Sequence, residues 1–107
     1  MGAMQPEVIL LNNRDCHVWG KVLHDLRREM DGLGTKSNVK VLEIDTDEQA
    51  KQYTFFGSPQ VLVNGKDIDP MAKKMTTFHV TGCRVYFWKG KGLDFPPKEM
   101  IKAALQK

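Results

Sequence analysis

Cysteine is scarce in this sequence, which has only Cys16 and Cys83 among its 107 residues. Two thiols are too few for a disulfide-stapled extracellular scaffold. Long hydrophobic runs are also missing: the longest apolar run near the start, residues 8–11, is shorter than a signal-peptide core, and no stretch approaches the ~20 residues that cross a membrane. The net charge is +3, but Lys and Arg are scattered along the chain. We therefore expect a cytoplasmic protein with reduced thiols that binds neither nucleic acid nor membranes.

The length of the chain suits one domain with a core of its own. Its composition, 41% hydrophobic and 27% charged, is typical of a folded globular protein. We interpret residues 1–6 as a disordered N-terminus or a remnant of cloning, with the natural start at Met4. Residues 7–107 are then the single domain, and we expect it to be a monomer.

Segments of strand and helix character alternate along the first half of the chain. Residues 7–12 are apolar at nearly every position, which predicts a strand buried on both faces. Apolar residues at three- and four-residue steps predict a helix over residues 19–33. β-Branched residues predict a second strand over residues 39–45, and Thr46 with Gln49 fits a capping box that starts a short helix.

The second half begins with a third predicted strand, residues 60–65, which leaves through an Asn-Gly turn signal. Residues 66–81 lack an apolar period, so we expect a polar loop that is the most mobile internal segment. Alternation over residues 83–88 predicts a fourth strand, and Pro97 suits the first turn of a last helix. The predicted order is β-α-β-α-β-β-α, an α/β fold with a central four-stranded mixed sheet flanked by helices.

Two features of this order carry a resemblance to a known family. Cys16 follows the first strand at the start of the first helix, and residues 57–61, which read G-S-P-Q-V, lead into the third strand. The chain thereby resembles the thioredoxin and glutaredoxin superfamily, whose members place a reactive Cys and a cis-proline there. It is also similar to small thioredoxin-like proteins that lack C-x-x-C and read G-S-P-x-V, N-G-x-D (here residues 64–67) and C-R-x-Y (here residues 83–86). The resemblance covers nearly all of residues 7–106.

This resemblance implies a thioredoxin-like fold with Cys16 as the catalytic thiol. It also implies a cis Ser58–Pro59 peptide bond, with Ser58 offering its backbone to an extended thiol substrate. His17 and Trp19 are the other expected substrate contacts, and Trp19 stands where thioredoxins have their resolving Cys. A thiol at a helix N-terminus is favoured as the nucleophilic thiolate.

The second thiol, Cys83, is expected at the start of the fourth strand, at the end of the sheet opposite Cys16. Four or five residues at ~3.3 Å place it roughly 15 Å away, beyond the ~7 Å Cα separation that a disulfide spans. It would then be a packed apolar thiol, and moving it to Cys16 would expose Val85 and Phe87. The alternative is that residues 66–81 fold up and carry Cys83 back to Cys16.

The resulting prediction is a thiol-dependent redox protein in which Cys16 acts as a single thiol on a thiol or disulfide substrate, either a protein or a small molecule. Two alternatives stay open. One is a redox-inactive protein- or peptide-binding module of the same fold, and the other is a one-thiolate handler of glutathione or a soft metal. No C-x-x-C or H-x-x-x-H pair is present, so we expect no metal site. We expect no resident cofactor, with glutathione as the one small thiol that the protein could use.

Overall fold

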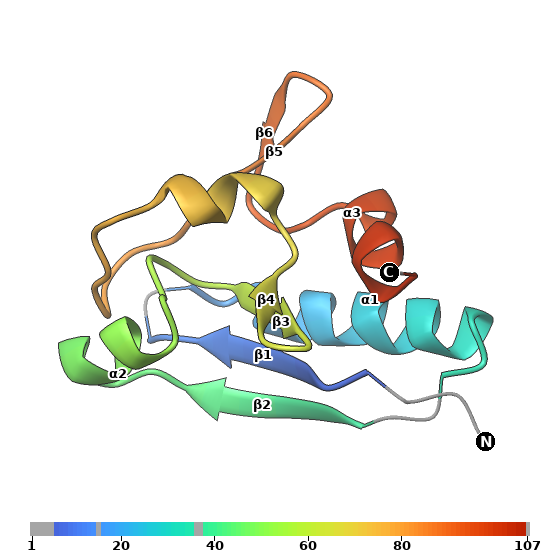
Figure 1. Cartoon of the computed structure of the whole chain (residues 1–107), viewed down its shortest axis with the longest axis horizontal. Coiled ribbons are helices and arrows are strands. Elements are labelled where there is room, and N and C mark those ends of the chain that lie inside the picture. The colour runs from blue at the N-terminus through green and yellow to red at the C-terminus, as the bar shows by residue number, and fades with distance from the viewer. Residues whose placement is uncertain (1–5, 15, 36–37, 107) are drawn as a thin grey trace.

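The computed structural model describes residues 6–14, 16–35 and 38–106, and it confirms an α/β fold in which helices flank a four-stranded mixed sheet (Figure 1). The strands of this sheet are β1 (Val8–Asn12), β2 (Val39–Glu43), β3 (Gln60–Val63) and β4 (Lys66–Asp67), in the order β2-β1-β3-β4. The helices are α1 (Trp19–Gly32), α2 (Asp47–Gln52) and α3 (Lys98–Leu105). Between β4 and α3 lie a 3-10 helix, η1 (Pro70–Lys74), and a separate hairpin of β5 (Tyr86–Trp88) and β6 (Lys91–Leu93).

Strand β1 is the centre of the sheet and is buried along its whole length. It runs parallel to β2 and antiparallel to β3, so that Val8 lies opposite both Val39 and Val63. Its side chains alternate between two cores: Leu10 belongs to one, and Ile9 and Leu11 belong to the other. The prediction of a strand buried on both faces is therefore confirmed.

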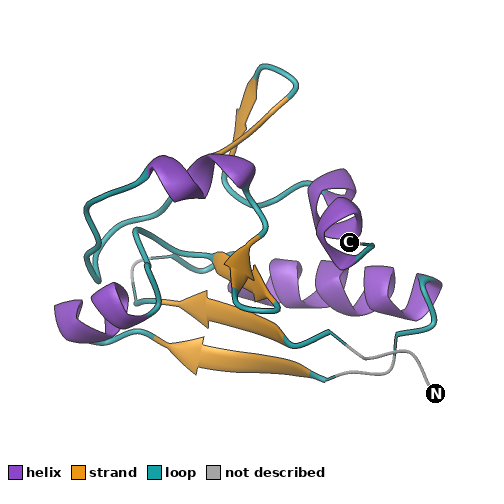
Figure 2. Cartoon of the chain, viewed as in Figure 1, coloured by secondary structure: helices purple, strands orange, loops and turns teal. Residues whose placement is uncertain are grey.

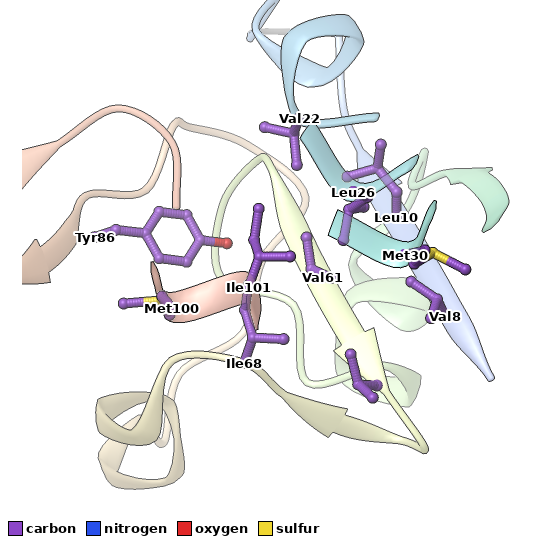
Figure 3. Close-up of a cluster of buried hydrophobic side chains, with 11 residues drawn as sticks. Val8, Leu10, Val22, Leu26, Met30, Val61, Ile68, Tyr86, Met100 and Ile101 are labelled. Atoms are coloured by element: carbon purple, nitrogen blue, oxygen red, sulfur yellow. The ribbon is translucent and has the colours of Figure 1, made fainter. Parts of the chain in front are cut away.

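The first core lies between the sheet and helices α1 and α3. Helix α1 contributes Val22, Leu26 and Met30, the residues at three- and four-residue steps that predicted it. Helix α3 contributes Met100 and Ile101 and packs beside α1 (Figures 1 and 3). Each of these buried apolar side chains stabilises the fold by about 1.5–3 kcal/mol.

The second core lies on the opposite face, under α2. Ala50 and Phe55 pack there, and Phe78 and Val80 cover them from the segment that follows η1. Helix α2 begins at the predicted capping box: the Gln49 backbone N–H donates to Thr46 Oγ1 over 3.1 Å, and the Gln49 side chain accepts from the Thr46 N–H over 3.2 Å.

The fourth strand of the sheet is not the one that the alternation predicted. Asn64 and Gly65, both at positive φ, turn the chain directly back against β3, so β4 takes this edge of the sheet. Residues 83–85 lie outside any strand, and β5 pairs only with β6 in the hairpin that stands apart from the sheet (Figure 2). Phe87, expected in the core, is 63% exposed.

The segment 66–81 is more structured than predicted, because it contains β4 and η1. That it is the most mobile internal segment stays a prediction. Of the expected disordered N-terminus, residues 1–5 lie outside the described residues. Within the described part of the chain, no helix combines the length and the apolarity that a membrane crossing needs.

Candidate functional site

Cys16 and Cys83 form a disulfide, with their Cα atoms 5.7 Å apart. The predicted separation of roughly 15 Å is therefore wrong, and with it the prediction that Cys16 is a single thiol without Cys83 as a partner. The cause is the route of the chain. After β4, residues 68–82 pass through η1 and return along the second core to the end of β1, where Cys16 lies. The alternative left open by the sequence, a segment that carries Cys83 back, is confirmed.

Cys16 lies between β1 and α1, two residues ahead of Val18, the N-cap of the helix. Its backbone N–H donates to Asn13 Oδ1 over 3.3 Å, and the residue is only 7% exposed. The N-cap residue Val18 makes no side-chain capping hydrogen bond, and no acidic residue lies in the first turn of α1. The positive end of the helix dipole lies close to Cys16 in the chain, which favours a thiolate there.

Asn13 ties the two cysteine segments together. This residue is 3% exposed, and its Nδ2 donates to the backbone oxygens of Val80 and Gly82, both over 2.8 Å. The same side chain accepts from the Cys16 N–H through Oδ1. Asn13 was not predicted as a site residue from the sequence. The signal for it was an amide at the end of a buried strand, where a buried polar side chain must find hydrogen-bond partners.

Ser58 fixes Cys83 from the other side. The Ser58 N–H donates to the Gly82 oxygen over 3.2 Å, and the Arg84 N–H donates to the Ser58 oxygen over 3.0 Å, so that Ser58 and Cys83 form a parallel bridge. The Ser58–Pro59 peptide is cis, as predicted. The Ser58 backbone that we expected to hold an external substrate thus binds the chain's own Cys83 segment. An outside peptide could pair with Ser58 only after that segment leaves.

Gly57 allows this close approach. Its φ is 141°, and a Cβ atom at this position would lie 2.9 Å from the Arg84 backbone nitrogen. Both the backbone conformation and the space therefore require glycine.

Arg84, next to Cys83, is buried in a polar network, with its side chain 1% exposed. Its guanidinium donates to both carboxylate oxygens of Asp67, over 2.8 and 3.1 Å, and lies 3.8 Å from Asp69. The rings of Phe56 and Tyr86 each lie 4.2 Å from it. The ion pair between Arg84 and Asp67 connects the two motifs noted in the sequence, because Asp67 belongs to N-G-x-D and Arg84 belongs to C-R-x-Y.

Charge and burial oppose each other in this network. Burial alone would lower the pKa of Arg84, but Tyr86, Asp67 and Asp69 outweigh it and raise this pKa, so the guanidinium stays charged. Burial also raises the pKa of Tyr86 far above its usual value, although Arg84 opposes the shift. The Tyr86 hydroxyl donates to the Pro59 oxygen, which attaches the start of β5 to the cis-proline segment.

The other predicted site residues are less closely engaged. His17 is exposed, and Trp19, the first residue of α1, is half-buried and packs against the first core. In the part of the chain that the structure describes, no three His, Cys, Asp or Glu side chains are grouped so that they could hold a metal ion. That the protein has no metal site stays a prediction.

Comparison with known proteins relates the chain to a family. The sequence model of a family described as a domain of unknown function, DUF2703, matches residues 17–105. This range contains Ser58, Asp67, Cys83 and Arg84 and begins one residue after Cys16. No curated protein and no solved structure matches the chain.

Proposed function

Because the chain belongs to the DUF2703 family, whose description assigns no activity, we propose a function from the geometry of the site: a thioredoxin-like thiol–disulfide redox protein with Cys16 and Cys83 as its redox pair. In this reaction the protein disulfide takes two electrons from two thiols, which leave as a disulfide. The protein keeps two thiol groups, and the reverse reaction reduces a substrate disulfide. This proposal replaces the single-thiol mechanism with a pair separated by 67 positions in the sequence.

The observation that carries the proposal is that Cys83 is held opposite Cys16 by contacts that do not depend on the disulfide. Asn13 binds the backbone at Val80 and Gly82, and Ser58 forms backbone hydrogen bonds on both sides of Cys83. Arg84 anchors the next residue to Asp67. A purely structural crosslink needs no such support, whereas a redox pair needs its thiols kept within reach after reduction.

Two further features support the proposal. Cys16 lies between a buried strand and a helix N-terminus, with a cis-proline segment across from it, which is the arrangement that the resemblance to thioredoxins implies. The expected cytoplasmic setting adds weight, because disulfides of cytosolic proteins are usually transient and catalytic or redox-sensing.

The test is a redox titration of the intact protein in mixtures of reduced and oxidised glutathione, followed by acid quenching, alkylation and mass mapping. We expect one two-electron transition between the Cys16–Cys83 disulfide and the dithiol, with the circular dichroism of a folded protein in both states. Reoxidation should return the same disulfide in high yield. A disulfide that is reduced only in denaturant, or whose reduction unfolds the chain, would make the crosslink structural and overturn the proposal.

A second candidate, a redox-inactive binding module, is favoured by one observation. A pocket of about 740 Å³ lies between η1, β4 and α3, with Ile68, Met75, Phe78 and Ala104 in its lining. Under this alternative the disulfide would only hold the wall of the pocket in place. Ligand binding in the pocket should then survive replacement of both cysteines, and the titration above should show no reversible transition in the folded state.

A further inference from the structure

The two cysteine residues of the disulfide are not equally exposed to solvent. Cys16 is 7% exposed and lies in the buried turn between β1 and α1, where Asn13 holds its backbone. Cys83 is exposed, and so is Val85 two residues later, while Arg84 between them is buried. The polar network pulls the Arg84 side chain inward, and the alternation of an extended chain then turns Cys83 and Val85 outward.

From this asymmetry we propose that Cys83 carries the sulfur that exchanges with outside thiols and that Cys16 is the internal, resolving partner. The inference rests on the proposed redox function and assigns a role to each cysteine. It reverses the expectation from the resemblance, under which the cysteine ahead of the first helix meets the substrate. The substrate class is a thiol or disulfide that reaches the exposed side of the 82–84 segment without pairing with the Ser58 backbone.

The first step of the exchange is attack of an outside thiolate on the Cys83 sulfur. A bond forms between the outside sulfur and Cys83, the Cys16–Cys83 bond breaks, and Cys16 leaves as a thiolate. Departure from the Cys16 side is favoured because this thiolate forms just ahead of the N-terminus of α1, where the helix dipole is positive. A second outside thiolate then attacks the outside sulfur of the mixed disulfide. The outside disulfide and the Cys83 thiolate are released, and protons from water complete the two thiols.

In the opposite direction the Cys83 thiolate attacks a substrate disulfide. It forms a mixed disulfide with one of the two substrate sulfurs and releases the other as the first substrate thiolate. Cys16 then attacks the Cys83 sulfur, expels the second substrate thiolate and restores the internal disulfide. The contacts of Asn13 and Ser58 hold the 82–84 segment next to Cys16 while this happens. The resolving step is therefore intramolecular between groups already in place, and it needs no unfolding.

The experiment compares two single-cysteine variants, Cys16→Ser and Cys83→Ser, each reduced and then mixed with oxidised glutathione. Initial rates of glutathione attachment are measured by mass spectrometry, in native buffer and in denaturing guanidinium. Because access limits thiol–disulfide exchange, we expect Cys83 in the first variant to react about ten-fold faster or more than Cys16 in the second. In guanidinium the two rates should be close to equal, which shows that the fold creates the difference.

A readout on the wild-type protein removes the dependence on variants that could fold poorly. The oxidised protein is mixed with reduced glutathione, quenched with acid within the first turnovers and mapped, and glutathione should be found on Cys83. Glutathione mainly on Cys16, or faster reaction of Cys16, would overturn the assignment while the redox pair stands. Exchange at neither sulfur until the chain unfolds would overturn the proposed function, and the inference with it.

Discussion

At the scale of single residues, the site depends on side chains whose burial would be costly if they were alone. The Arg84 guanidinium is removed from water, and the hydrogen bonds that it donates to Asp67, with the rings of Phe56 and Tyr86, offset that loss. Arg84 is adjacent to Cys83 in the chain, so its placement fixes the position of the thiol. Removing the charge would leave Asp67 and Asp69 partly buried without their cation.

Arg84→Met tests this dependence. Because one partner of a buried ion pair is lost, we expect the free energy of unfolding of the reduced protein to fall by about 3 kcal/mol, as measured by urea denaturation. Closure of the disulfide by an added oxidant should also slow. Arg27→Met, on the exposed face of α1, is the matched control and should change neither quantity appreciably. An Arg84 variant as stable as the wild type would show that the network does not position Cys83.

Asn13→Asp changes one group in the link between the cysteine segments. The substitution places an oxygen where Nδ2 now donates to the Val80 and Gly82 carbonyls. An acceptor facing two acceptors should lower the free energy of unfolding by about 1–3 kcal/mol at neutral pH and slow disulfide closure. Asn38→Asp, at an exposed position, adds the same charge elsewhere and serves as the control. Equal closure rates in the two variants would contradict the role given to Asn13.

At the scale of elements, the sequence predicted the helices and strands that local pattern determines. It did not predict the placement of segments that depends on the path of the chain. Strand β1 followed from its continuous apolar run, helix α1 from its apolar period and α2 from its capping box. The alternation over residues 83–88 was real, but its meaning was inverted: the polar Arg84 lies inside and Phe87 outside. The carboxylates of Asp67 and Asp69 help to make the burial of Arg84 favourable, and no pattern within residues 83–88 reports such distant partners.

The site was predicted only in part for the same reason, because local pattern does not report the path of the chain. Cys16 and Ser58–Pro59 were assigned as site residues from the resemblance, and the structure brings both against the Cys83 segment, which was not predicted. The distance to Cys83 was wrong because it was derived from an assumed strand direction. A two-residue β4 set by the Asn64–Gly65 turn, and the return of the chain after η1, are tertiary features that cannot be read from local spacing.

Strand β5 is attached to the segment before β3 through Tyr86, and this gives a pH-dependent prediction. The pKa of Tyr86 is raised by burial in the folded state, so its contribution to stability is fully present below the unfolded value of about 10 and declines as the pH rises above it. Tyr86→Phe should lower the free energy of unfolding by about 1 kcal/mol at pH 7, through loss of the bond to Pro59.

The measurement is urea denaturation of both proteins from neutral to strongly alkaline pH. The difference in stability between the wild type and Tyr86→Phe should shrink as the pH rises past about 10, because only the wild type has this phenol to ionise on unfolding. Tyr53→Phe is the control, since Tyr53 is not fully buried. A difference that stays constant across this range would contradict the buried position of the phenol.

At the scale of the whole molecule, the disulfide connects two segments that lie far apart in the sequence. Its loop spans a sequence separation of 67 residues and contains α1, β2, α2, β3, β4 and η1. A crosslink of this length reduces the conformational freedom of the unfolded chain far more than that of the folded one. The site therefore couples redox state to global stability.

Reduction of the wild-type protein should lower its free energy of unfolding by about 4 kcal/mol, because the unfolded chain regains the conformational entropy that a loop of this length removes. Urea denaturation with and without a phosphine reductant measures the difference. The reductant should have no effect on a Cys16→Ser, Cys83→Ser double variant. A reduced protein as stable as the oxidised one would mean that the unfolded state retains the proximity of residues 16 and 83.

The crosslink also makes residues 16–83 a covalent ring, with the hairpin and α3 on a tail outside it. A protease that cuts once inside the ring, for example trypsin at the exposed Lys73 or Lys74, opens the ring but leaves a single molecule, which separates into two fragments on a gel only after reduction. A cut at Lys89 or Lys91 releases the tail with or without reductant. In the Cys83→Ser variant both kinds of cut should release fragments at once. The number of bands after limited proteolysis therefore reports the redox state of the site. In a cell, the oxidised protein cut between residues 73 and 75 would keep its two fragments together for as long as the disulfide lasts.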